Sequence, residues 1–147
     1  MKEFKRVFSA LVTPFSSGNV DFESYRKLVQ SQLNDGIRGF VVNGTTGESP
    51  TLSWDEVEEL YKIARNICPP EVKIVLGTGS NSTKKTIDNN IKAAKLGADA
   101  ALVVVPYYNK PTQQGLLEHF KAAASAASIP NILYNVPGRT VVSLEVD

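Results

Sequence analysis

The stretch Gly39-Phe40-Val41-Val42-Asn43-Gly44-Thr45-Thr46-Gly47-Glu48-Ser49 decides the fold. Its first four residues form an apolar run typical of a short buried strand. The Ser-x-x-Glu pattern of Ser53-Trp54-Asp55-Glu56, which follows, indicates a helix start. Two glycines and two threonines therefore lie where a strand ends and a helix is about to begin, which is where α/β folds bind ligands. Threonine hydroxyls and the free N–H groups of such a turn can hold a small carboxylate. The alternative is a polar loop in front of a capped helix.

The same succession of strand, polar loop and helix recurs along the chain, with a period of roughly 30 residues. The run Ala100-Ala101-Leu102-Val103-Val104-Val105 is apolar without alternation, as in a strand that a parallel sheet buries on both faces. Helices are predicted after Asp21, after Ser53, up to Gly97 and around Leu116–Ala127, and a further one near Asp147. The strands are predicted at residues 7–13, 39–42, 73–76, 100–105 and 129–134.

Two parallel α/β architectures fit this pattern. A doubly wound open sheet of five strands suits a chain of 147 residues. A β/α barrel needs eight units and typically about 250 residues, so the chain would be a little over half of one. The periodicity alone leaves both open.

Composition excludes several classes of function. The net charge of +1 gives no reason to expect nucleic acid or an acidic membrane as a partner, and 42% apolar residues argue against disorder. No stretch approaches the roughly 20 apolar residues of a membrane helix. Cys68 is the single cysteine, so no intrachain disulfide forms, which fits a reducing, cytoplasmic location. His119 has no second histidine or cysteine at metal spacing, so no metal site is expected.

Chemistry-bearing side chains collect in the loops after the predicted strands. In a parallel sheet these loops share the C-terminal rim, where sites are built. An arginine there can grip a carboxylate through two hydrogen bonds, and a phenol-hydroxyl-phenol chain can move a proton. The set is Thr45, Thr46, Thr78, Ser80, Asn81, Tyr107, Tyr108, Tyr134 and Arg139.

Each of these residues has a structural alternative. Tyr134 could be a core aromatic whose hydroxyl is bonded locally. The Tyr107-Tyr108 pair could be an interface patch. Arg139, after a Pro-Gly pair, could be a solvated turn residue.

Three motifs together resemble the dihydrodipicolinate synthase / N-acetylneuraminate lyase family of class I aldolase-type β/α barrels. The tyrosine pair and Arg139 resemble the dihydrodipicolinate synthase branch. The resemblance covers the whole chain and implies that residues 1–147 are the N-terminal half of a single TIM-barrel domain, with the first four βα units and strand five. The motifs are Gly44-Thr45-Thr46-Gly47-Glu48-Ser49, Pro106-Tyr107-Tyr108-Asn109-Lys110-Pro111 and Tyr134-Asn135-Val136-Pro137-Gly138-Arg139-Thr140.

The resemblance also implies a reaction. In the family, pyruvate forms a Schiff base with a lysine, loses a proton to give an enamine and attacks aspartate semialdehyde, towards diaminopimelate and lysine. Tyr134 would donate and accept the proton, with Thr45 and Tyr108 completing its relay, and Tyr108 would reach in from a neighbouring subunit of a homodimer or homotetramer. Thr46 would hold the pyruvate carboxylate, and Arg139 would meet the carboxylate of the second substrate. No cofactor beyond the Schiff base is implied.

The Schiff-base lysine of the family belongs on the sixth strand, beyond Asp147. Lys110 does not occupy its motif position. The resemblance therefore implies a half-enzyme or truncated relative that is inactive alone. Two alternatives are another pyruvate-dependent aldolase acting on a sugar acid and a non-catalytic carboxylate-binding or assembly module.

Family members that bind lysine as a feedback inhibitor do so at a site that this chain matches in part. Lys85 stands where sensitive members have a glutamate, and its ammonium would repel the amino group of the inhibitor. Val57 offers no polar contact. The sequence thus predicts weak or absent lysine inhibition. The matching positions are Ser49, Pro50, Trp54, Val57, Asn81, Lys85 and Tyr107.

Overall fold

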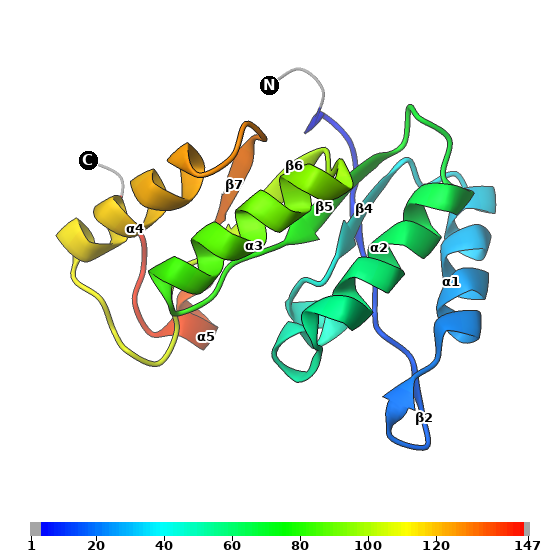
Figure 1. Ribbon diagram of the computed structural model, residues 1–147, viewed down its shortest axis with the longest axis horizontal. Coiled ribbons are helices and arrows are strands. Elements are labelled where there is room, and N and C mark those ends of the chain that lie inside the picture. Colours follow the sequence, from blue (N-terminus) through cyan, green and yellow to red (C-terminus); the bar gives the residue numbers. More distant parts are fainter. Residues whose placement is uncertain (1–3, 146–147) are drawn as a thin grey trace. The chain divides into compact units, whose positions relative to one another are not determined.

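The structure is a computed structural model that describes residues 4–145. The chain divides into two compact units, residues 1–76 and 77–147. Both units are built from strands and helices in alternation (Figure 1).

Among its described residues, the first unit contains three parallel strands, two α-helices, a small hairpin and the 3-10 turns η2 and η3. The parallel strands lie in the order β1-β4-β5, with Ser9 opposite Phe40 and Gly39 opposite Lys73. Helices α1 and α2 pack against each other and run side by side in Figure 1. The elements are β1 (Ser9–Ala10), β2 (Phe15–Ser16), β3 (Asn19–Val20), α1 (Phe22–Asn34), β4 (Gly39–Val42), η2 (Thr45–Gly47), η3 (Ser49–Thr51), α2 (Trp54–Ile67) and β5 (Lys73–Gly77), whose last residue lies in the second unit.

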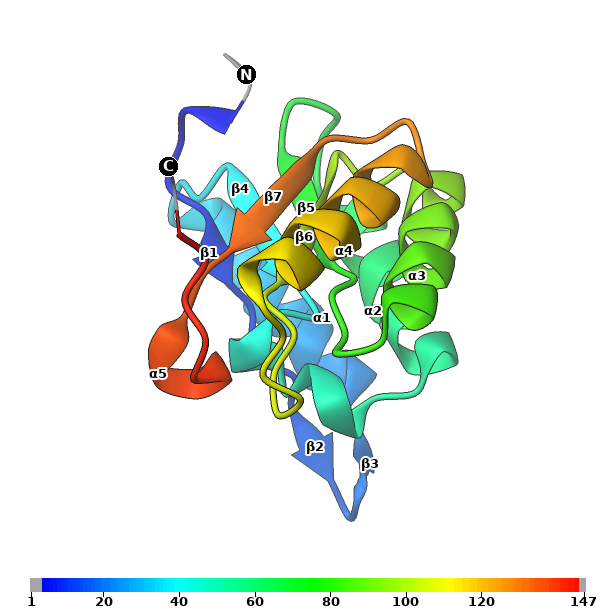
Figure 2. The ribbon, with the colours of Figure 1, turned by 90° about the vertical axis from the view of Figure 1, so that its left-hand side faces the viewer.

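The second unit repeats this pattern around one further strand pair. Strands β6 and β7 are parallel, with Ala101 opposite Asn131 and Val104 opposite Tyr134, and Figure 2 shows them beside α4. Helices α3 and α4 pack against each other. The elements are α3 (Thr83–Leu96), β6 (Ala100–Val104), α4 (Gln113–Ser125), β7 (Asn131–Tyr134) and α5 (Pro137–Thr140).

The order of the strands favours a barrel over a doubly wound sheet. In the first unit each parallel strand lies beside the next one in sequence, and the two connecting helices touch. A doubly wound sheet instead reverses its strand order at a switch point and covers both faces with helices.

Local sequence explains where the helices begin. Asp21 caps α1 by accepting from Ser24 N–H at 2.9 Å, and this bond together with one from the Ser24 hydroxyl lowers the pKa of the Asp21 carboxyl. The predicted capping box of α2 is confirmed, because Ser53 N–H donates to Glu56 Oε2 at 2.7 Å while Glu56 N–H donates to Ser53 Oγ at 3.3 Å. Gly97, with φ of 83°, ends α3 as predicted.

Several observed elements differ from the predicted ones. The first strand is confined to Ser9–Ala10, and residues 16–19 belong to the β2–β3 hairpin, which was not predicted. Ser17 and Gly18, at the hairpin tip, have φ of 51° and 82°, the left-handed pair of a type I′ turn. The fifth strand begins at Asn131 rather than at residue 129. The helix predicted near Asp147 lies outside the described residues. A short helix that was not predicted, α5, forms at Pro137–Thr140.

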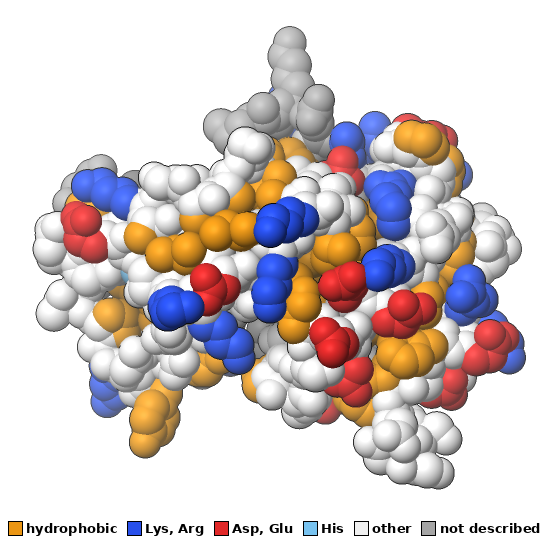
Figure 3. All heavy atoms as spheres, viewed as in Figure 1, with side chains coloured by type: hydrophobic (Ala, Val, Ile, Leu, Met, Phe, Trp, Pro, Cys, Tyr) orange, Lys and Arg blue, Asp and Glu red, His pale blue; other side chains and the backbone are white. Residues whose placement is uncertain are grey.

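The surface carries charges of both signs. Figure 3 shows lysine and arginine side chains interspersed with aspartate and glutamate on the face that it presents. Ion pairs one helical turn apart, such as Lys62–Glu58 at 2.6 Å and Lys84–Asp88 at 2.7 Å, join some of them. Such exposed pairs contribute little to stability, so packing rather than surface charge holds the helices in place.

Candidate functional site

The loop after β4 folds into a tight turn that presents two threonines to solvent. Gly47 N–H donates to Gly44 C=O and Glu48 N–H to Thr45 C=O, both at 3.1 Å, which forms η2. The backbone N–H groups of Thr45 and Thr46 make no hydrogen bond with the described residues of the first unit, and neither do their hydroxyls. Two N–H groups and two hydroxyls are thus available for a small anion.

Thr13 anchors this turn from the segment that follows β1. Its buried hydroxyl donates to Gly47 C=O at 2.7 Å. A Cβ at Gly47 would lie 3.0 Å from Leu11 C=O and 3.4 Å from Thr13 Oγ1, so only glycine allows this close approach without displacing neighbours. The sequence analysis missed Thr13, because nothing in its local pattern distinguishes it from other strand-end threonines.

Thr13→Val should destabilise the protein by about 1–3 kcal/mol, because it leaves the buried Gly47 carbonyl without a donor. The measurement is the urea unfolding midpoint of the 147-residue chain. Thr13→Ser keeps the hydroxyl and is the matched control. A Thr13→Val variant as stable as wild type, beside a destabilised Thr13→Ser, would show that the methyl group, and not the hydrogen bond, holds the turn.

The loop after β5 is held by a buried threonine of α3. Thr86 is fully buried and its hydroxyl accepts from Ser80 N–H at 3.0 Å. Asn89 Nδ2 donates to Thr78 C=O at 3.1 Å. Ser80 and Thr78 are themselves buried, so their backbone is fixed rather than open to a ligand. Asn81 is half-buried, and its carbonyl accepts from Asn109 Nδ2 at 3.0 Å.

The loop after β6 turns Tyr108 outward. Tyr108 has φ of 73° and its side chain is 90% exposed, whereas Tyr107 is half-buried. A bulky residue in the left-handed region costs conformational energy, so surrounding structure must impose it. The exposed phenol of Tyr108 is therefore directed away from its own unit.

Tyr134 ends β7 and Arg139 lies in the α5 turn that follows. Tyr134 C=O accepts from Val105 N–H at 3.0 Å, which fixes its backbone. Its half-buried side chain donates to no described residue of its unit, and the exposed Arg139 guanidinium forms no ion pair there. Both groups are thus free to meet a substrate. Because Val104 and Tyr134 lie opposite each other, the loops that carry Tyr108 and Arg139 leave the same edge of the β6–β7 pair.

The candidate residues fall into two groups, one in each unit. Thr45 and Thr46 share one turn of the first unit, and Ser49 and Pro50 lie in the next turn, η3. The second unit holds Tyr107 and Tyr108 on one loop, Tyr134 and Arg139 on the adjacent connection, and Asn81 and Lys85 around the start of α3.

His119 lies within α4 and Cys68 directly follows α2, so neither residue belongs to these loops. His119 is buried in α4, where its Nδ1 lies 2.9 Å from the Thr83 hydroxyl, and burial lowers the pKa of its imidazole. Cys68 is a buried free thiol after α2, and burial raises its pKa, which makes the thiolate scarce. Neither residue has the environment of a catalytic group.

Within residues 4–145, no three His, Cys, Asp or Glu side chains gather closely enough to hold a metal ion. No helix in this range is long and apolar enough to cross a membrane.

One buried amide in the second unit, Asn90, was also not identified from the sequence. Asn90 is fully buried, and its Nδ2 donates to Ala123 C=O and to Asn131 Oδ1, each at 2.8 Å. It links α3 to the end of α4 and to β7, so its role is to hold the helices on the strand. An asparagine in an amphipathic helix pattern carries no local sign of such a role.

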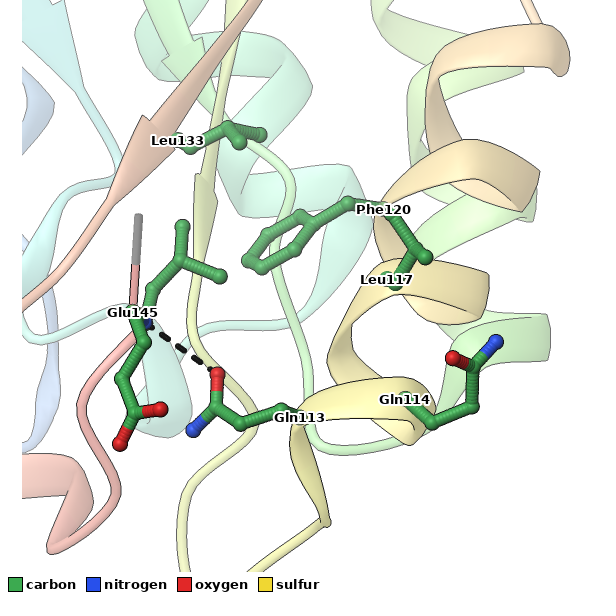
Figure 4. Close-up of a pocket in the computed structure, with 7 residues that line it drawn as sticks. Gln113, Gln114, Leu117, Phe120, Leu133 and Glu145 are labelled. Atoms are coloured by element: carbon green, nitrogen blue, oxygen red, sulfur yellow. Dashed lines mark hydrogen bonds between the residues drawn. The ribbon is translucent and has the colours of Figure 1, made fainter. Parts of the chain in front are cut away.

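A cleft of about 300 Å³ lies in the second unit, between α4 and the residues that follow α5 (Figure 4). None of the predicted site residues lines it. Its lining residues are Gln113, Gln114, Leu117, Phe120, Leu133, Leu144 and Glu145.

Comparison with known proteins assigns the chain to a protein family. The model of the dihydrodipicolinate synthetase family matches residues 3–147. A 4-hydroxy-tetrahydrodipicolinate synthase from Bdellovibrio bacteriovorus is 61% identical over 145 residues, which are 99% of this chain and 50% of the relative. The chain thus spans about half the length of the relatives it matches.

Solved structures agree with this. The chloride-inhibited dihydrodipicolinate synthase from Acinetobacter baumannii, complexed with pyruvate, superposes with a TM-score of 0.92 at 48% identity over 95% of this chain and 48% of its own. The enzyme from Cyanidioschyzon merolae with lysine bound superposes with a TM-score of 0.89 at 44% identity. This match covers 97% of this chain and 49% of the Cyanidioschyzon chain. These neighbours are TIM barrels, which confirms the predicted β/α-barrel fold. The chain belongs to the dihydrodipicolinate synthetase family.

Proposed function

We propose that this chain carries the carboxylate-binding and proton-transferring residues of a 4-hydroxy-tetrahydrodipicolinate synthase, which condenses pyruvate with aspartate semialdehyde. The observation that carries the proposal is the η2 turn, in which Thr45 and Thr46 present unbonded N–H and hydroxyl groups to solvent. The Bdellovibrio relative, at 61% identity, bears the name of this activity.

Thr46 and the N–H groups of η2 bind the pyruvate carboxylate. A carboxylate gains charge-assisted hydrogen bonds there without displacing an existing partner. The Thr13 hydroxyl holds the backbone of the turn at Gly47, so the turn is preorganised for the anion. The Acinetobacter structure is a complex with pyruvate, which agrees with this ligand.

Tyr134 moves the proton. Schiff-base formation releases water from the pyruvate carbonyl, and loss of a C3 proton then gives the enamine, so a group that both accepts and donates is needed. The Tyr134 phenol has no hydrogen-bond partner in its own unit that would compete for this role. Thr45 and Tyr108 complete the relay, and the outward-directed Tyr108 supplies its phenol to a neighbouring subunit.

Arg139 binds the carboxylate of aspartate semialdehyde. Its guanidinium is exposed and unpaired among the described residues of its unit, and it can make two parallel hydrogen bonds to a carboxylate. The Schiff-base lysine belongs to the part of the relatives that the chain does not match. The pyruvate adduct on that lysine is the only cofactor-like group in the proposal.

A chimera tests the function. Residues 1–147 replace the matching half of the Bdellovibrio relative, so that the relative supplies the remaining strands. Pyruvate with borohydride should then give one stoichiometric adduct by intact mass, mapped outside residues 1–147, and the chimera should consume aspartate semialdehyde. The chain alone should give no adduct. An adduct on Lys110 or another lysine of the chain would contradict the placement of the nucleophile, and pyruvate binding without turnover would favour a binding module.

The site for lysine as an inhibitor is part of this proposal, and we expect it to bind lysine weakly. Ser49, Asn81 and Tyr107 offer polar contacts, but Val57 is buried at 2% exposure and makes none. Lys85 lies exposed in the first turn of α3. Two like charges about 4 Å apart repel by about 1–4 kcal/mol at effective dielectric constants between those of water and a protein surface.

Lysine should therefore inhibit the chimera only weakly, and Lys85→Glu should strengthen inhibition at least about tenfold, which corresponds to about 1.4 kcal/mol. The measurement is a lysine titration of turnover. Lys84→Glu is the matched control, because Lys84 is its neighbour in sequence and pairs with Asp88. Strong inhibition of the unmodified chimera would contradict the prediction.

A shared site also implies an assembly. If Tyr108 crosses to a neighbouring subunit, the active form is at least a homodimer, and we propose a homodimer or homotetramer. A cytoplasmic location accords with the single free cysteine, Cys68.

A further inference from the structure

The backbone after Arg139 returns to the end of β7, where two amide side chains hold it. Asn135, the residue after Tyr134, brackets the backbone of Leu144: its Oδ1 accepts from Leu144 N–H at 3.0 Å and its Nδ2 donates to Leu144 C=O at 3.2 Å. Nδ2 also lies 3.3 Å from Ser143 Oγ. A single side chain thus reproduces the two hydrogen bonds that a neighbouring strand would make.

Gln113, the first residue of α4, holds the same segment by a second amide. Its Nε2 donates to Ser143 C=O at 2.9 Å, and its Oε1 accepts from Glu145 N–H at 3.2 Å. Figure 4 shows the bond between Gln113 and Glu145 at the edge of the cleft. Asn135 and Gln113, called here the amide clamp, together pair with three consecutive backbone positions.

Alternating burial shows that this segment is packed as well as bonded. Val142 and Leu144 are half-buried against the core cluster of the second unit, which contains Leu116 and Phe120, whereas Ser143 and Glu145 are exposed. Period-two burial is the pattern of an extended strand with one face on a core. The hydrophobic core and the amide clamp therefore each hold residues 142–145, which lie at the C-terminal end of the segment after Arg139.

The loop closed in this way carries Arg139. Thr140 is 1% exposed, and its hydroxyl lies 2.9 Å from Val142 C=O. Val141 has φ of 67°, which a β-branched residue adopts only where its surroundings impose it. A strained, internally bonded turn with both ends held can present one side chain in one orientation.

We propose that Asn135 and Gln113 are positioning residues, whose amide clamp closes residues 136–142 into a rigid loop and so orients the Arg139 guanidinium, and the adjacent Tyr134, for the second substrate. The identity of the second substrate rests on the proposed function. The amide clamp itself rests on the structure alone. Neither amide touches substrate. They act by removing conformations that Arg139 would otherwise have to lose on binding.

The first experiment uses the 147-residue chain as it is. Amide hydrogen exchange by NMR is compared for wild type, Asn135→Ala and Gln113→Ala. A hydrogen bond of average strength changes the equilibrium constant for local opening by about fivefold. The loss of two such bonds should therefore speed amide exchange about 10- to 30-fold. Asn135→Ala should speed exchange at Leu144 N–H, and Gln113→Ala should speed exchange at Glu145 N–H, because each variant removes the acceptor of that group. Both should also speed exchange at Val141 N–H, which donates to Pro137 C=O within the loop.

The second experiment separates positioning from structure in the chimera. Both variants should raise KM for aspartate semialdehyde about 10-fold, while KM for pyruvate stays within about twofold, because the carboxylate turn belongs to the other unit. Asn135→Asp keeps the acceptor for Leu144 N–H but replaces the donor to Leu144 C=O, so it should fall between wild type and Asn135→Ala.

Gln114→Ala is the matched control. Gln114 lines the same cleft, but its amide bonds Glu118 on its own helix at 3.0 Å, so neither exchange nor KM should change. Unchanged exchange at Val141 in the clamp variants would overturn the proposal, and so would faster exchange with an unchanged KM for the semialdehyde. A wild-type chimera that turns over no substrate would refute the proposed function instead, while the exchange experiment would still decide whether the clamp closes the loop.

Discussion

Replacing Tyr134 with phenylalanine should lower kcat of the chimera by a factor of about 10² to 10⁴, the range for a removed general acid–base group. The substitution deletes one hydroxyl that makes no hydrogen bond to a described residue of its unit. Stability should therefore remain close to wild type, and the loss should fall on proton transfer. The borohydride-trapped pyruvate adduct should still form, but more slowly.

Tyr25→Phe is the matched control for Tyr134→Phe. Tyr25 lies buried in α1, and its hydroxyl also has no hydrogen-bond partner among the described residues, so the same atom is removed from a residue outside the proposed site. Turnover should not change. Full activity of Tyr134→Phe would exclude Tyr134 from the proton relay and return it to the role of a half-buried aromatic.

Replacing Gly79 with alanine should destabilise the chain by about 3 kcal/mol, at the upper end of the cost of overpacking. A Cβ at Gly79 would overlap the backbone nitrogen of Val104 and lie 2.9 Å from its Cγ1. Gly79 N–H also donates to Leu102 C=O at 3.3 Å. Because the obstacle is the backbone of β6 rather than a mobile side chain, the strand itself must shift.

Gly138→Ala is the control for Gly79→Ala, because no atom lies within 4 Å of its Cβ position and its φ is not positive. Urea unfolding of both variants measures the difference. A change below about 0.5 kcal/mol for Gly79→Ala, the range of ordinary surface substitutions, would show that β6 tolerates the extra atom.

Local pattern predicted the helices well. Ser53 and Glu56 form the predicted reciprocal cap, Asp21 caps α1 and Gly97 ends α3. These features involve residues three or four apart, so the sequence that encodes them is contiguous. The β2–β3 hairpin was missed although Ser17-Gly18 is a turn pair, because two-residue strands show no alternation that a window can detect.

The candidate loops were also predicted from the sequence, but not what holds them. Thr45, Tyr108 and Arg139 follow predicted strands and Tyr134 ends one, and the parallel pairing of β6 with β7 brings the loops of Tyr108 and Arg139 to one edge. Thr13 reaches the Thr45–Gly47 turn across 34 positions, and Gln113 reaches Glu145 across 32. No short-range pattern encodes such a bond.

The sequence by itself determined the order of the parallel strands and of the four longer helices, the caps at Asp21, Ser53 and Gly97, the candidate loops and, through its motifs, the family. All of these features depend on residues that are close in sequence or on short sequence motifs. Only the tertiary structure decided that Thr13, Asn135 and Gln113 fix those loops, that Gly79 must lack a side chain and that Tyr108 faces outward. These properties arise when distant segments are packed to contact distance, where a single hydrogen bond or a single methyl group determines which backbone conformations remain.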